Sequence, residues 1–94
     1  MNLPEGILKI PVSCFEQAYI SELKIPNSVL SIDHYAFYST KINILYLPDS
    51  LEKVANDVFI NLRCPSIIYK GKIYNTNTIT QALKDNGVYL LWNI

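Results

Sequence analysis

Apolar residues return along this chain at a fixed interval, from Leu3 to Ile25 and again to Leu47, with polar residues between them. The segments 3–24, 25–46 and 47–68 align without gaps, and each opens with an apolar residue followed by proline. A period of about 22 residues indicates a repeat protein. The matching columns are Leu3/Ile25/Leu47, Ile7/Val29/Leu51, Ile10/Ile32/Val54, Cys14/Ala36/Val58, Phe15/Phe37/Phe59, Ile20/Ile42/Cys64 and Leu23/Leu45/Ile67.

The repeat predicts stacking, because one such unit cannot bury its own apolar face, whereas units laid on one another share a core. The alternating stretch near each proline predicts a strand, at Ser21–Ile25, Asn43–Leu47 and Pro65–Tyr69. Strands stacked about 4.8 Å apart form a parallel sheet, and proline belongs at strand ends. The stretch around each phenylalanine is expected to form a tight helical turn on the opposite side.

The C-terminal part breaks the period. Tyr69–Tyr74 predicts a hairpin-like turn around a glycine. Apolar residues at helical spacing, followed by Gly87, predict a short helix at Ile79–Asn86. Val88–Trp92 is then a short strand or extended segment. Because the last unit of a stack exposes its core, we expect this helix, with Trp92, to act as a cap.

The string IPNSVLSIDHYAF, residues 25–37, resembles the unit of BspA-type leucine-rich repeats, roughly I-P-x-S-V-x-x-I-x-x-x-A-F. The resemblance covers about residues 3–74 and is closest in the middle repeat. It implies surface-displayed or secreted interaction and adhesion modules whose repeat has no catalytic activity. We predict a mainly β, right-handed leucine-rich solenoid of three coils with short helical turns (residues 1–70), followed by a C-terminal turn, helix and capping segment (71–94).

Charge and hydropathy narrow the range of possible binding partners. Eight basic and eight acidic residues give a net charge of zero, without the positive field that nucleic-acid binding needs. No stretch approaches the roughly 20 apolar residues of a membrane span, and the N-terminus does not resemble a signal peptide. We expect no nucleic-acid or membrane partner. An intracellular location is expected if the chain is whole, and a cell-surface or secreted one if it is part of a longer protein.

Candidate catalytic side chains are few. His34 is the single histidine; it aligns with turn residues, and we expect an ordinary surface side chain that Asp33 could hydrogen-bond. The carboxylates of Glu22, Asp33, Asp49 and Asp57 fall in different columns, so no acid–base pair is predicted. We therefore expect that the protein is not an enzyme and has no metal site or cofactor.

The two cysteines lie in different apolar columns. Cys14 and Cys64 are separated by about two stacked units, or roughly 10 Å along the axis. This distance exceeds the Cα separation of about 7 Å that a disulfide allows. We expect two free, largely buried thiols that pack as small hydrophobes.

Alternation along the strands predicts a surface. If Leu23, Ile25, Leu45, Leu47, Ile67 and Tyr69 point inward, their neighbours point outward. The result is an apolar patch with a polar rim, typical of partner-binding sites. Alternatively, the C-terminal segment covers these residues, or they are scattered surface residues. The predicted partner-binding residues are Ile44, Tyr46 and Ile68, with Lys24, Glu22 and Lys70 as the rim.

Two further surfaces are expected. The first repeat begins almost at Met1, leaving no residues for a cap, so the edges of Ile7, Ile10, Phe15 and Ile20 should be exposed beside unpaired strand groups. A partner, a second copy in a homodimer, or further repeats of a longer protein could cover this edge. Tyr19, Tyr35 and Tyr38 could form a weaker surface on the turn side, with stacking between coils as the alternative.

These features predict a protein–protein interaction module that binds through its strand face, its N-terminal edge, or both. Two alternatives remain open. One is a small inhibitor from a phage or mobile element that blocks a host enzyme by surface contact. The other is a structural fragment of a larger surface adhesin.

Overall fold

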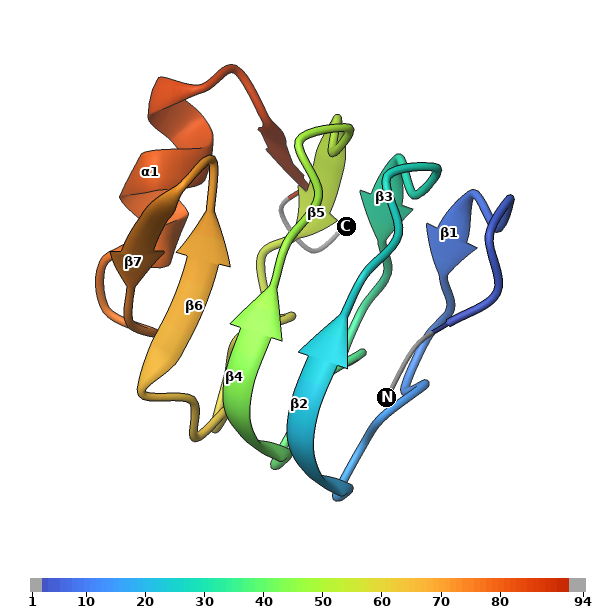
Figure 1. Cartoon of the computed structure of the whole chain (residues 1–94), viewed down its shortest axis with the longest axis vertical. Coiled ribbons are helices and arrows are strands. Elements are labelled where there is room, and N and C mark those ends of the chain that lie inside the picture. Colours follow the sequence, from blue (N-terminus) through green and yellow to red (C-terminus); the bar gives the residue numbers. More distant parts are fainter. Residues whose placement is uncertain (1–2, 92–94) are drawn as a thin grey trace.

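The computed structural model describes residues 3–91, with the backbone alone for Leu91. These residues form eight short strands and one helix, and Figure 1 shows the strands in two rows that run across the molecule. The fold is therefore a repeat fold that is mainly β. In chain order the elements are β1 (Lys9–Ile10), β2 (Tyr19–Lys24), β3 (Ser31–Ile32), β4 (Lys41–Tyr46), β5 (Lys53–Ala55), β6 (Ser66–Tyr69), β7 (Lys72–Tyr74), α1 (Ile79–Asp85) and β8 (Tyr89–Leu91).

The first sheet has the order β2-β4-β6-β7 and contains the predicted strands. β2 pairs in parallel with β4, and β4 with β6, the equivalent strands of successive repeats, so that Leu23 lies beside Leu45 and Leu45 beside Ile67. β2 and β4 begin two residues before the predicted starts and end one residue before the predicted ends. The register predicted from the repeat is confirmed.

A second sheet, β1-β3-β5-β8, was not predicted. Its strands have two or three residues, too few for alternation to be visible in the sequence. Each of the first three contributes an inward apolar residue from the same column, namely Ile10, Ile32 and Val54. The repeat therefore stacks two rows of strands, one on each side of the core.

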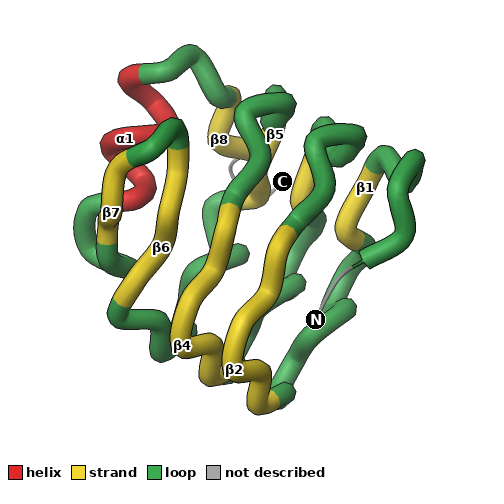
Figure 2. The backbone as a smooth tube through the Cα atoms, in the orientation of Figure 1, coloured by secondary structure: helices red, strands yellow, loops and turns green. Residues whose placement is uncertain are grey.

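The turns around the phenylalanines join the second sheet to the first, and the prediction that they are helical is wrong. Figure 2 shows these connections as loops. The Cys14 amide donates to the Pro11 carbonyl at 3.2 Å, as in a tight turn. Ser13 and Gln17 have positive φ angles of 57° and 62°, a left-handed conformation that interrupts a right-handed helix.

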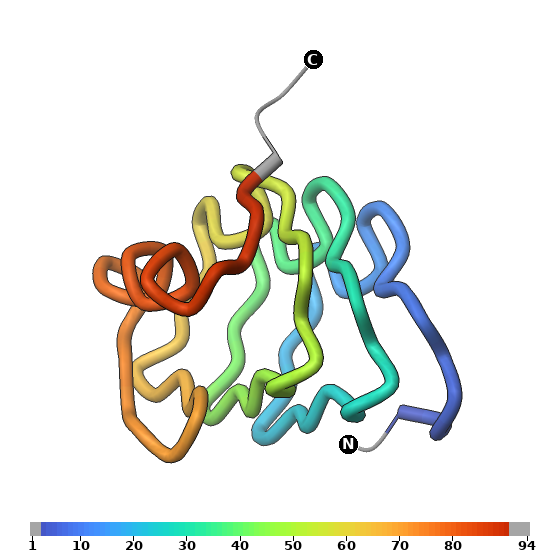
Figure 3. The backbone as a smooth tube through the Cα atoms, turned by 90° about the horizontal axis from the view of Figure 1, so that it is seen from above, coloured from blue at the N-terminus to red at the C-terminus, as the bar shows by residue number. Residues whose placement is uncertain are grey.

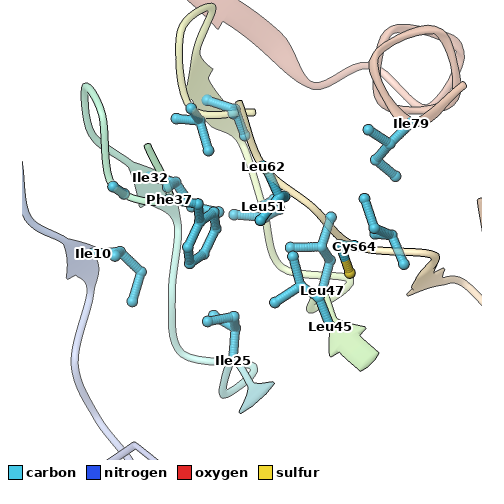
Figure 4. Close-up of a cluster of buried hydrophobic side chains, with 14 of the residues drawn as sticks. Ile10, Ile25, Ile32, Phe37, Leu45, Leu47, Leu51, Leu62, Cys64 and Ile79 are labelled. Carbon is cyan, nitrogen blue, oxygen red and sulfur yellow. The ribbon is translucent and has the colours of Figure 1, made fainter. Parts of the chain in front are cut away.

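The core lies between the two sheets, and Figure 4 shows side chains from both directed into it. Phe15 and Phe37 stack with ring centroids 5.7 Å apart. The expected exposure of the first repeat is wrong for Ile10, Phe15 and Ile20, which are 1%, 9% and 7% exposed. Ile7 is partly buried. These side chains point between the sheets and pack against the next repeat. The N-terminal end of the stack therefore exposes the backbone edge of its strands and not its core side chains.

The C-terminal part adds one strand to each sheet. β7 pairs with β6 in an antiparallel hairpin, whose turn residues Lys70 and Gly71 have positive φ angles of 50° and 77°, as two-residue hairpins favour. β8 pairs in parallel with β5. The predicted hairpin, helix and final strand are confirmed as far as Leu91, and Trp92 lies outside the described residues.

Helix α1 lies at the end of the row of strands away from the N-terminus (Figure 3). It turns Ile79 and Leu83 into the core, where both are fully buried. Asn86 follows as the C-cap residue, and Gly87, with a φ of 80°, ends the helix where the sequence predicts.

Candidate functional site

The solvent side of the first sheet brings the predicted partner-binding residues together. We call this surface the outer face. Leu23, Leu45 and Ile67 are fully buried, so their neighbours along the strands point outward. The outer face consists of two cross-strand rows, Glu22–Ile44–Ser66 and Lys24–Tyr46–Ile68–Ile73.

Three of these outward-pointing residues are less exposed than alternation alone implies. Ile44, Tyr46 and Ile68 are half-buried by their neighbours. Ile73, on β7, is 71% exposed and pairs directly with Ile68. Sequence reasoning missed Ile73 because it interpreted the hairpin as a turn and not as a further strand. β7 thus extends the outer face at its edge and does not cover it.

A third row lies at the start of β2 and β4 and continues to Arg63, just before β6. Tyr19 pairs with Lys41, and Lys41 bridges to Arg63 on the next repeat. The Lys41 ammonium lies 5.1 Å from the centre of the Tyr19 ring, within the range of a cation–π contact. Tyr19 is 69% exposed, and its grouping with Tyr35 and Tyr38 stays a prediction.

Strict alternation is interrupted in β2. Ile20 and Leu23 are both buried, whereas Ser21 and Glu22 are both exposed. Tyr19, next to the buried Ile20, points outward at the start of β2. Tyr35 and Tyr38 do contact each other on the turn side, edge to face at 5.4 Å.

Beside Lys41 and Arg63 lies a groove of about 550 Å³, which we call the basic groove. It runs between two equivalent turns of neighbouring repeats. Thr40 forms a rigid part of its wall, because this side chain is buried and its hydroxyl donates to the Phe15 carbonyl at 2.6 Å. The lining residues are Ser39, Thr40, Lys41, Asn61, Leu62 and Arg63.

His34 has a carboxylate partner other than the predicted Asp33. Its Nδ1 lies 3.0 Å from Oδ2 of Asp57, a residue that is 6% exposed. The Tyr35 amide donates to Oδ1 of the same carboxylate at 3.2 Å. Asp33 instead accepts the backbone amide of His34 at 2.8 Å and lies 3.8 Å from Lys9. Asp57 thus ties the turn of the second repeat to that of the third.

The cysteines are both free, and one of them is not where the repeat predicts. Cys64 is 5% exposed, and its burial raises the pKa of the thiol. Cys14 is exposed, although Ala36 and Val58 in the same column are fully buried. Each of those two follows an earlier repeat, whereas Cys14 belongs to the first. Partial burial raises the pKa of Cys14 as well, so neither thiol has the lowered pKa of a reactive nucleophile.

Within residues 3–91 no cluster of three or more histidine, cysteine, aspartate or glutamate side chains could hold a metal ion. Nor does any helix in that range have the length and hydropathy to cross a membrane. Sequence reasoning also missed Lys41 and Arg63. These two residues occupy the same position of the repeat as Tyr19, and this shared position could have revealed them.

The chain matches a protein-family model. The family described as "BspA type Leucine rich repeat region (6 copies)" matches residues 1–83. This range includes all three repeats and the hairpin, and it extends into α1. Neither the curated proteins nor the solved structures contain a match.

Proposed function

The chain belongs to the BspA-type leucine-rich repeat family, and from this premise we propose that it binds a protein partner through the outer face. Leucine-rich repeats are in general protein–protein interaction modules, and the family is typically non-enzymatic. For the architecture we propose a right-handed solenoid of three coils closed by α1. The pairing of each strand with its equivalent in the next repeat supports this architecture.

One observation carries the proposal. Tyr46, Ile68 and Ile73 form an unbroken cross-strand row of apolar side chains on the solvent side of a sheet. Lys24 continues the row at one end, and Glu22 lies in the row beside it. Apolar residues clustered inside a polar rim are the surface pattern of a protein-binding site.

The test compares the same substitution on two sheets. Tyr46→Asp puts a charge into the outer face, and Tyr89→Asp does so on the exposed side of the second sheet. Proteins captured from a lysate by the unmodified chain and by the Tyr89 variant, but lost with Tyr46→Asp and Ile44→Asp, support the proposal. If both outer-face variants fold normally by circular dichroism and keep every partner, the outer face is not the binding site.

The backbone edge of the first repeat favours a second candidate, a homodimer. Among the described residues β1 and β2 each pair with one strand, and an unpaired edge can accept a strand from another chain. Leu8 and Val12 in this repeat are 62% and 55% exposed. Light scattering that gives the monomer mass at millimolar concentration would reject the dimer without affecting the outer-face proposal.

A further inference from the structure

We propose that the basic groove and the adjoining outer face bind an acidic peptide segment, whose carboxylates contact Lys41 and Arg63. This inference rests on the proposed protein-binding function and specifies the chemistry of the partner. It starts from two cations that the fold places side by side.

Lys41 and Arg63 lie directly opposite each other on neighbouring repeats. Like charges in such positions destabilise a sheet. Neither side chain has an ion pair with an acidic residue in the part of the chain that the structure describes. The Tyr19 ring beside Lys41 orients the ammonium but does not neutralise it. A bound carboxylate would remove this repulsion and gain two charge-assisted hydrogen bonds.

The shape and composition of the basic groove suit an anion. The six residues that line it include two cations and no acid. The guanidinium of Arg63 can hold a carboxylate through two parallel hydrogen bonds, whereas Lys41 supplies a compact point charge. The groove is open along one side and bounded by the buried Thr40, so an extended chain can enter without rearrangement of the core.

The second sheet differs in how its lysines are arranged. Lys9 lies 3.8 Å from Asp33, and Ser31 stands between it and Lys53 in the row. Lys41 and Arg63 instead lie next to each other, and no acidic residue lines the groove beside them. In a chain of zero net charge, the basic groove is therefore a locally positive region.

The neighbouring apolar row makes a peptide a better fit than a polyphosphate chain. Ile44 follows Lys41 by three residues, so the groove and the apolar residues are at most about 10 Å apart along the strand. An acidic peptide with apolar side chains can contact both. Nucleic acid would use the two cations and leave the apolar residues uncovered, and the neutral chain has no broad positive field to attract it.

The experiment is a selection of random dodecapeptides displayed on phage, run on three folded proteins. These are the unmodified chain, the Lys41→Gln/Arg63→Gln variant, and a control with the same charge loss on the second sheet, Lys9→Gln/Lys53→Gln. We expect peptides enriched in Asp and Glu beside apolar residues from the unmodified chain and the control, and no acidic enrichment from the groove variant. In fluorescence anisotropy, a selected peptide should bind the groove variant at least about tenfold more weakly, from loss of charge-assisted hydrogen bonds.

Four outcomes decide the matter. Selected peptides that lose binding with Tyr46→Asp but show no acidic enrichment would reject this inference and leave the proposed function standing. Peptides that bind equally to Tyr46→Asp would reject the outer face itself. Equal weakening by the second-sheet control would show a general charge effect and reject the groove. Tighter Lys41- and Arg63-dependent binding of a single-stranded DNA oligonucleotide than of the acidic peptides would replace the peptide with a phosphate polymer.

Discussion

The first and second sheets bury equivalent ladders of residues but present different surfaces to solvent. Inward, Leu23, Leu45 and Ile67 of one sheet face Ile10, Ile32 and Val54 of the other, and all are at most 1% exposed. Outward, the row on the first sheet is Lys24, Tyr46, Ile68 and Ile73, whereas that on the second is Lys9, Ser31, Lys53 and Tyr89.

This difference separates what folding requires from what it leaves free. Stacked repeats need apolar residues inside, because each repeat covers the next. Folding does not require apolar residues outside, and the second sheet carries two lysines and a serine in its outward row. The apolar row of the first sheet is therefore better explained by binding to a partner than by folding.

The largest expected effect tests whether the two sheets share one core. Phe37→Ala should lower the free energy of unfolding by about 3–5 kcal/mol, because Phe37 is fully buried and stacked on Phe15. Phe59→Ala, in the same column but only partly buried, should cost less. Urea unfolding measures both. Amide exchange that leaves one sheet protected after the other has opened would show that the sheets do not form one cooperative unit.

A smaller effect concerns the turns that join the sheets. Asp57→Ala should lower the free energy of unfolding by about 1.5–3 kcal/mol, since it removes the charged acceptor of the His34 ring and of the Tyr35 amide. Asp33→Ala removes the acceptor of the His34 amide and a 3.8 Å contact with Lys9. It should cost less, because the Asp33 side chain is 29% exposed and that of Asp57 only 9%. A double-mutant cycle with His34→Ala checks the coupling, and additive losses would mean that the pair does not link the repeats.

The response to alkaline pH should arise at Tyr69 in the first sheet and at the two cysteines, because burial raises the pKa of all three. Burial, with the nearby Asp49 and Tyr74, raises the pKa of Tyr69, and burial raises that of Cys64. Unfolded chains lose these protons near about pH 10 and pH 8.5. The folded state keeps them to higher pH, so the associated stability is present below these values and is lost as the pH rises above them.

The urea midpoint should therefore fall from about pH 8.5 upward. Tyr69→Phe should reduce the part of this fall near about pH 10, because Phe cannot ionise. Tyr89→Phe, on the exposed side of the second sheet, is the matched control for the substitution. If the urea midpoint falls identically in the unmodified chain and in both variants, groups other than Tyr69 cause the alkaline response.

The smallest effects on stability are expected at the two outer surfaces. Ile73→Ser on the first sheet and Lys53→Ser on the second should each change the free energy of unfolding by no more than about 0.5 kcal/mol, because both side chains are exposed. Peptide binding should nevertheless weaken for Ile73→Ser alone. Loss of more than this stability in the Ile73 variant would mean that the row serves folding, and the contrast between the sheets would lose its functional meaning.

Much of the fold could be predicted from particular residues. The column Leu23/Leu45/Ile67 predicts the register of the strands in the first sheet, and Gly87 correctly marks the end of α1. Errors arose where the pattern is too short or is interrupted. Ser31–Ile32 is too short to predict a strand, and positive φ angles at Ser13 and Gln17 interrupt the turn that was expected to be helical.

The candidate site was predicted in part. Ile44, Tyr46, Ile68, Lys24 and Glu22 do share one side of one sheet, as alternation predicts. Their role in binding stays a prediction. Ile73 was missed because a hairpin brings it beside Ile68, whereas Lys41 and Arg63 share one position of the repeat and could have been predicted from it.

The sequence by itself determined the period of the repeat, the register of the strands and most of the buried side chains, because burial follows from apolar residues that recur at the spacing of the repeat. The tertiary structure alone decided which exposed residues are neighbours outside the register of the repeat. It placed Asp57 beside His34 and Ile73 beside Ile68. Both contacts depend on turns with positive φ, at Tyr35 and at Lys70 and Gly71, and these turns change the direction of the chain without changing the apolar pattern.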